Sequence, residues 1–151
     1  MTELQSLYKL LDDYSEFNVS GNPDKFLDSA EKIILINDPN SIPILLSYFD
    51  DSREYGWVFE TLMISLERYS ESEHIQALLK NLETLLKKAP NWASSIFNRI
   101  LNTERGISLF IQYIHLTSKE SLLKLFNLME VEFPHHQELI KTLKQKMAYS
   151  T

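Results

Sequence analysis

Glycine is scarce in this chain, and this scarcity restricts the folds that are open to it. Only Gly21, Gly56 and Gly106 occur among the 151 residues. Glycine-rich loops that bind phosphate and tight β-hairpin turns both need residues with positive φ, a conformation that glycine adopts without steric cost. The sequence therefore argues against a nucleotide-binding loop and against a sheet of short hairpins. We expect a helical protein with short connections.

Apolar residues recur with the period of an α-helix along most of the chain. The clearest case is the stretch 38–69, in which two apolar segments flank an acidic turn at residues 50–54. The second segment, predicted over residues 53–69, has one side that carries Tyr55, Val58, Phe59, Leu62, Leu66 and Tyr69. The opposite side carries Trp57, Glu60, Thr61, Ile64 and Arg68. We therefore expect Trp57 and Ile64 to lie off the main core face.

The helical segments predict an all-α fold of about eight or nine helices joined by short turns. The first four are expected at residues 2–17, 22–36, 41–49 and 53–69, and a fifth from the Ser70 cap to about Lys88. Short turns favour adjacent antiparallel pairs, and these pairs recur about every 30–40 residues, as in helical-repeat proteins. We predict one domain over residues 1–151, with antiparallel helix pairs stacked as a short HEAT-like α-solenoid. An irregular helical bundle is the alternative.

Acidic residues are concentrated in the first part of the chain. Residues 1–60 hold 12 acidic and 4 basic residues, a net charge of −8, whereas residues 61–151 hold 9 acidic and 11 basic residues, a net charge of +2. An acidic surface repels phosphate backbones and attracts a basic partner. We therefore expect a protein partner and no direct contact with nucleic acid. A well-solvated surface is the alternative explanation of the acidity.

The sequence carries no signature of catalysis or of a cofactor site. It has no cysteine, no GxSxG motif, and no pair of histidines at the i, i+4 spacing of helical metal sites. Acidic pairs such as Asp12–Asp13 and Asp50–Asp51 fall in expected turns or on helix surfaces, where solvation argues against acid–base chemistry. We therefore predict that the protein is not an enzyme and uses no cofactor and no metal.

No part of the sequence suggests a membrane protein. The longest uninterrupted apolar run is Ile33–Ile36, whereas a membrane-spanning helix needs about 20 apolar residues. The first residues lack the basic and apolar regions of a secretory signal, and the absence of cysteine fits a reducing compartment. We therefore expect a cytoplasmic protein that makes no contact with a membrane.

Recognition of another protein is the function that these observations leave open. An aromatic anchor within a charged surface suits a basic ligand, because charges speed and orient encounter while Trp, Tyr and Arg supply much of the affinity. The candidate partner-binding residues are Asp50, Asp51, Glu54, Trp57, Glu60, Ile64, Glu67 and Arg68. The alternative for Trp57 and Ile64 is packing against a second layer of helices.

Two segments carry a family resemblance. They are GWVFETLMISLERY at Gly56–Tyr69, which ends in an aliphatic, acidic and aromatic step with Arg68 inserted, and APNWASSIFNRILN at Ala89–Asn102, which closes with Arg-Ile-Leu-Asn. Together they resemble the all-helical immunity proteins of bacterial contact-dependent growth inhibition and other polymorphic toxin systems. The resemblance covers about residues 38–116.

The resemblance implies a function and a partner. It implies that the chain binds and neutralises a cognate bacterial toxin, often a nuclease with a basic cleft, by stoichiometric blockade of its active site. It also implies a cytoplasmic monomer bound one-to-one to the toxin. Glu67 and Arg99 could instead form a buried ion pair between helices. A helical-repeat adaptor that binds a basic protein or peptide is the alternative function.

Overall fold

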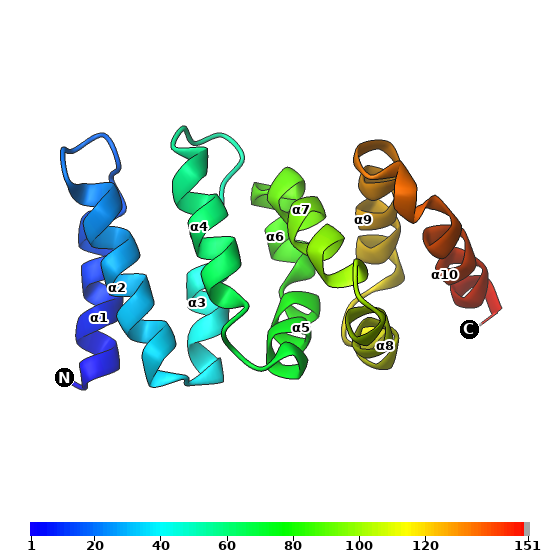
Figure 1. The fold of residues 1–151 in the computed structure, drawn as a ribbon, viewed down its shortest axis with the longest axis horizontal. Coiled ribbons are helices and arrows are strands. Elements are labelled where there is room, and N and C mark those ends of the chain that lie inside the picture. The colour runs from blue at the N-terminus through cyan, green and yellow to red at the C-terminus, as the bar shows by residue number, and fades with distance from the viewer. Residues whose placement is uncertain (150–151) are drawn as a thin grey trace. The chain divides into compact units, whose positions relative to one another are not determined.

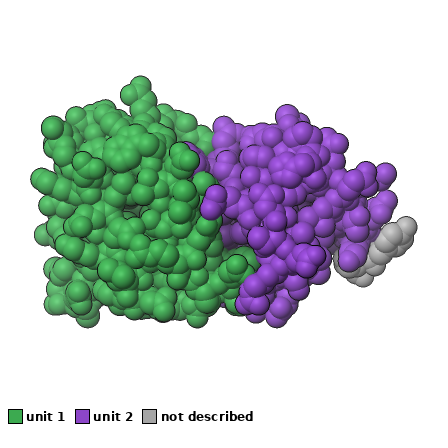
Figure 2. Space-filling view, viewed as in Figure 1, with its two compact units in different colours: residues 1–77 green, residues 78–151 purple. Residues whose placement is uncertain are grey.

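The structure is a computed structural model that describes residues 1–149, and every regular element among these residues is a helix (Figure 1). This confirms the predicted all-α fold. The chain divides into two compact units, Met1–Ala77 and Leu78–Thr151 (Figure 2), which we call unit 1 and unit 2. A single domain and a solenoid-like stacking of the helix pairs stay predictions.

Unit 1 is built from helix pairs. Its elements are α1 (Glu3–Tyr14), α2 (Asn22–Ile36), the 3-10 helix η1 (Pro39–Ser41), α3 (Ile42–Leu46) and α4 (Gly56–Leu66). Helix α1 packs on α2, and α2 lies beside α4. The chain reverses direction between successive helices, so α2 and α4 run the same way (Figure 1). Helices α2 and α4 are therefore parallel neighbours within unit 1.

Aromatic side chains form the centre of unit 1. The ring of Phe17 meets Phe26 edge-on at a centroid distance of 5.1 Å and lies 5.9 Å from Phe59. Phe49 also packs against Phe59, at a centroid distance of 5.6 Å. All four side chains are buried. Burial of such rings stabilises each helix against its neighbours by far more than local helix propensity does.

Helix α4 is shorter than predicted. It begins at Gly56, because Tyr55 adopts the left-handed conformation with φ of 69°, and it ends at Leu66 instead of Tyr69. Tyr69 lies beyond the helix, where its buried hydroxyl shares a hydrogen bond with Ser41. The apolar period continued through residues 53–69, but the backbone is helical only over residues 56–66.

Unit 2 repeats the same construction with different elements. Helix α5 (Glu71–Lys80) spans the boundary between the units, and α6 (Leu82–Lys88), α7 (Pro90–Leu101), α8 (Glu104–Tyr113), η2 (Ile114–Leu116), α9 (Lys119–Glu132), η3 (Pro134–His136) and α10 (Gln137–Tyr149) follow. Helix α7 packs against α6, α8 and α9, and α10 packs against α9. The core of unit 2 contains the buried rings of Phe97, Phe110 and Phe126.

The helix predicted to run from the Ser70 cap to Lys88 is interrupted. Asn81 leaves the helical conformation, with φ of −109° and ψ of 10°, so α5 and α6 are separate helices. Residues 1–149 therefore contain ten α-helices, more than the eight or nine predicted. The Ser70 cap itself is confirmed, because its hydroxyl accepts a hydrogen bond from the Glu73 amide at 3.1 Å.

Among the described residues, no helix combines the length and the apolar character that crossing a bilayer would require.

Candidate protein-binding face

Helix α4 separates its buried and outward sides as the sequence predicts. Val58, Phe59 and Leu62 are fully buried, whereas Trp57 is 49% exposed and Ile64 is 46% exposed. Glu60, Thr61 and Arg68 are exposed as well. Trp57 and Ile64 therefore form a short apolar stripe on the outside of unit 1, about two helical turns long.

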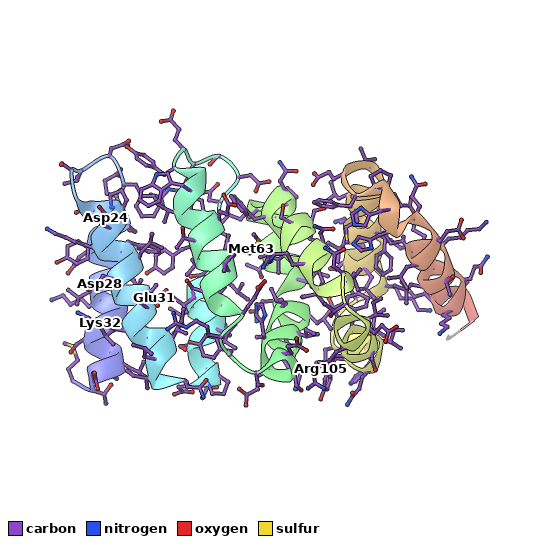
Figure 3. The ribbon with its side chains drawn as sticks, viewed as in Figure 1. Asp24, Asp28, Glu31, Lys32, Met63 and Arg105 are labelled. Atoms are coloured by element: carbon purple, nitrogen blue, oxygen red, sulfur yellow. The ribbon has the colours of Figure 1, made fainter. Side chains whose placement is uncertain are left out.

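Helix α2, which lies beside α4, carries a row of charged groups. Asp24, Asp28 and Lys32 follow one another at i, i+4 spacing, and Figure 3 shows them along one side of α2. Asp28 pairs with Lys32 at 3.1 Å. Glu31 lies on the side of α2 that faces α4 (Figure 3). Of the acidic side chains of α2, Glu31 is therefore the one that lies next to α4.

Glu31 fixes the two helices side by side. Its Oε1 accepts a hydrogen bond from the Ser65 hydroxyl at 2.8 Å, and its Oε2 pairs with the Arg68 guanidinium. Both contacts join residues of α2 to the C-terminal end of α4, where the two helices run the same way. Arg68 was predicted to bind the partner, and its guanidinium already neutralises Glu31 within the chain.

Carboxylates border the apolar stripe on both of its sides. Glu31 lies on the α2 side. A helix turns by about 100° per residue, so Glu60 lies on the flank opposite Ser65 and Arg68, which contact α2. We call the set of Asp24, Asp28, Glu31, Trp57, Glu60 and Ile64 the α2–α4 face. An apolar centre with a charged rim is the arrangement typical of protein-binding surfaces.

The loop before α4 is held in place by the loop between α1 and α2. The Arg53 guanidinium lies 4.2 Å from the centroid of the Phe17 ring and donates a hydrogen bond to the Ser15 carbonyl. Tyr55 donates from its hydroxyl to Asn18 Oδ1 at 3.1 Å. Together the two loops line a polar cavity of about 460 Å³, with Glu54 among its lining residues. The first turn of α4 therefore starts from an ordered support.

The other predicted acidic residues occupy different surroundings. Asp50 is half-buried, and its Oδ1 accepts hydrogen bonds from the Ser52 amide at 2.9 Å and from the Ser52 hydroxyl at 2.7 Å. Asp51 is half-buried, and Glu54 is exposed. Asp50 therefore orders its own loop, while Glu54 presents its carboxylate to solvent next to the start of α4.

Glu67 and Arg99 are not buried, as the suggested buried ion pair between them would require. Both side chains are exposed. Glu67 follows the last residue of α4, and Arg99 lies in the last turn of α7. Arg99 lies on the same helix as the buried Ile96 and Phe97, but the helical period turns residue 99 outward.

Sequence reasoning missed the contribution of α2. Asp24, Asp28 and Glu31 were not among the candidate residues, although the i, i+4 spacing of the two aspartates marks an outward stripe. Periodicity assigns a residue to a face of its own helix. It does not reveal which other helix lies beside that face, and so the pairing of α2 with α4 could not be read from the sequence.

Unit 1 also buries a histidine side chain. His74 is buried, and its Nε2 has no hydrogen-bond partner among the described residues. Burial lowers the pKa of His74 to about 4, and the negative charge of Glu67 opposes part of this shift. Within residues 1–149, no three His, Asp or Glu side chains are grouped so that they could hold a metal ion. The outward surface of unit 1 therefore offers contact chemistry: an aromatic ring, an aliphatic side chain and carboxylates.

Fold and face together define a class of protein, an all-helical chain whose outward surface is suited to contact with another protein. The family model described as Immunity protein 30 matches residues 14–110, and the chain belongs to this family. It is therefore an immunity protein of a polymorphic toxin system, and its partner is a cognate toxin. The match includes α2 and α4. No curated protein and no solved structure matches the chain significantly.

Proposed function

We propose that this immunity protein neutralises a nuclease toxin by covering its active site with the α2–α4 face. The observation that carries the proposal is the half-exposed Trp57 and Ile64 stripe between carboxylates of two helices. A nuclease cleft is basic because it binds phosphates. An acidic surface with an apolar anchor complements such a cleft and occupies the space of the nucleic acid.

The charge of unit 1 supports this choice of partner. Residues 1–77 hold 15 acidic and 5 basic residues, a net charge of −10. Such an excess accelerates encounter with a basic protein and weakens as salt screens it. The eight residues that we propose for partner binding from the sequence are Asp50, Asp51, Glu54, Trp57, Glu60, Ile64, Glu67 and Arg68. To them we add Asp24, Asp28 and Glu31 of α2.

The proposed mode of action is binding without turnover. One immunity protein binds one toxin domain, and inhibition follows from occupancy of the cleft. The complex forms in the cytoplasm of the producing cell and its siblings, as in contact-dependent growth inhibition. The carboxylates of the face act as hydrogen-bond acceptors for the toxin's cations, and Trp57 and Ile64 exclude water from the centre.

Co-expression with the cognate toxin domain tests the proposal. Growth should be restored, and the purified pair should form a one-to-one complex in which nucleic-acid cleavage is blocked. Rising concentrations of a nucleic acid that the toxin binds but cannot cleave should compete with the immunity protein. Formation of a stable ternary complex with that nucleic acid would show that the active site stays open and would reject blockade.

A further inference from the structure

We propose that the Trp57 indole is the docking point for an arginine side chain of the toxin. The guanidinium stacks on the exposed ring while Glu60 accepts its hydrogen bonds. This inference rests on the proposed function, because it names the group through which a basic toxin engages the α2–α4 face. It predicts a preference for arginine over lysine that blockade of a basic cleft does not require.

The Trp57 ring is available to a partner. The side chain is 49% exposed in the first turn of α4. Within the described chain, the indole N–H has no hydrogen-bond acceptor, and the hydrogen bond from Thr61 goes to the Trp57 backbone carbonyl at 2.8 Å. Trp side chains at protein surfaces commonly combine a large apolar contact with one polar group. Both remain open to a ligand here.

Unit 1 already covers two of its aromatic rings with cations. Arg53 lies over Phe17 at 4.2 Å from the ring centroid, and Lys25 lies over Tyr14 at 5.4 Å. No cation among residues 1–149 covers Trp57. Tryptophan attracts cations more strongly than phenylalanine or tyrosine does, because its ring has the largest electrostatic potential on its face. The ring best suited to a cation is therefore the one that the chain leaves open.

Carboxylates stand next to this ring on its own segment of chain. Glu60 lies one turn further along α4, at i+3 from Trp57, and residues at this spacing are neighbours on a helix surface. Glu54 precedes Trp57 by three residues, in the ordered loop. Both side chains are exposed, and neither forms an ion pair with another described residue. A cation seated on the ring would meet these carboxylates.

Arginine fits this arrangement better than lysine does. The guanidinium is planar, so it stacks flat on an indole while its N–H groups point outward in the plane toward a carboxylate. Its fork of donors can engage both oxygens of Glu60. The lysine ammonium is a compact and strongly hydrated point charge, and it loses more hydration when it approaches the ring.

The first experiment uses the free protein and defined peptides. The chain has two tryptophans, Trp57 in unit 1 and Trp92 in unit 2, so the two indole N–H signals in an NMR spectrum serve as site and control. Trp57→Phe assigns the signals. Titration with amide-capped tetra-arginine should shift the Trp57 signal to saturation and leave Trp92 in place. Tetra-lysine should bind at least about 3-fold more weakly. Equal shifts with both peptides, or a Trp57 signal that does not move, would overturn the inference.

The second experiment uses the toxin and separates this inference from the proposed function. Ile64→Asp places a charge in the apolar stripe and tests whether the α2–α4 face binds the toxin at all. Trp57→Leu keeps an apolar side chain without an aromatic ring, whereas Trp57→Phe keeps a ring, and circular dichroism checks that all three variants are folded. We expect Trp57→Leu to lose about 10-fold more toxin affinity than Trp57→Phe. If Ile64→Asp abolishes toxin binding while Trp57→Leu and Trp57→Phe have equal toxin affinity, the α2–α4 face is supported as the binding surface and the arginine contact is rejected. If none of the three weakens binding, the proposed function falls too.

Discussion

The two units share a construction and differ in their surfaces. Each packs helices around a cluster of phenylalanine rings. Unit 1 carries a net charge of −10, whereas residues 78–151 hold 6 acidic and 10 basic residues, a net charge of +4. The same packing rules therefore support opposite surface charges. The core determines that the chain folds as helices, and the outward residues determine which partner each unit can approach.

The apolar surfaces of the units differ as well. In unit 1, Trp57 and Ile64 stand among carboxylates. In unit 2, Leu86, Pro90, Leu128 and Val131 line a groove of about 480 Å³ between α6 and α9. Near this groove, Lys87 pairs with Glu83 at 3.7 Å and Lys124 with Glu120 at 3.4 Å. The charges around the unit 2 groove are largely balanced, whereas the apolar stripe of unit 1 lies in a unit with a strong excess of negative charge.

The largest effect on stability is expected from Gly106→Ala in unit 2. A Cβ atom at residue 106 would lie 1.8 Å from the Ile100 carbonyl oxygen, and backbone would have to move. We expect the free energy of unfolding to fall by about 3 kcal/mol. Gly56→Ala in unit 1 is the matched control, because nothing lies within 4 Å of the added atom. Urea denaturation of both variants measures the difference, and equal stabilities would contradict the close approach.

The same glycine variant tests whether the units fold together. Trp57→Phe leaves Trp92 as the fluorophore of unit 2, and Trp92→Phe leaves Trp57 as that of unit 1. If residues 1–151 form one cooperative domain, Gly106→Ala shifts both reporters by the same amount. Two separate transitions, with only the Trp92 signal shifted, would replace the single domain with two independently folding units.

The next effect concerns His74 and the pH dependence of unit 1. The pKa of His74 falls from 6.5 to about 4 in the folded protein because its imidazole is buried. The unfolded chain therefore binds the proton more readily, and lowering the pH through this range favours unfolding. Between about pH 7 and pH 5, this histidine alone should remove about 2 kcal/mol of the free energy of unfolding.

His74→Leu removes the titrating group and keeps an apolar side chain of similar size. The variant should lose about 2 kcal/mol less stability than the original chain between about pH 7 and pH 5. Urea denaturation at the two pH values gives the comparison. The same pH dependence in both proteins would show that the buried imidazole titrates as it does in the unfolded chain.

The smallest effect is expected where the two helices of the face meet. The Arg68 and Glu31 side chains are 45% and 38% exposed, so solvent screens their ion pair. Arg68→Ala should lower the free energy of unfolding by less than about 1 kcal/mol. Thermal denaturation measures it. A loss several times larger would mean that this pair, and not the buried aromatic residues, holds α2 against α4.

The sequence predicted the elements of the fold that depend on local pattern. Periodicity separated the two sides of α4, and the Ser70 cap was identified correctly. Prediction from the sequence failed where the backbone conformation interrupts a helix although the apolar pattern continues. Tyr55 adopts positive φ although it is not glycine, and Asn81 interrupts an apolar run that continues on both sides of it. Neither residue type enforces these conformations, so neither break could be predicted.

The candidate site was predicted only in its α4 half. Trp57, Glu60 and Ile64 share a face of one helix, and a single period reveals them. The α2 half depends on the contact between Glu31 and the end of α4, which joins residues 34 and 37 positions apart. Local patterns carry no information on such a contact. The α2 residues of the proposed face could therefore not be identified from the sequence.

The affinity of the toxin for two matched variants tests the central claim most directly. Ile64→Asp in unit 1 and Leu123→Asp in unit 2 each place a carboxylate at an aliphatic side chain of similar exposure, 46% and 43%. We expect calorimetry with the cognate toxin domain to show at least about a 100-fold loss for Ile64→Asp and less than about a 3-fold change for Leu123→Asp. The reverse order, or equal losses in both, would contradict the assignment of toxin binding to the α2–α4 face.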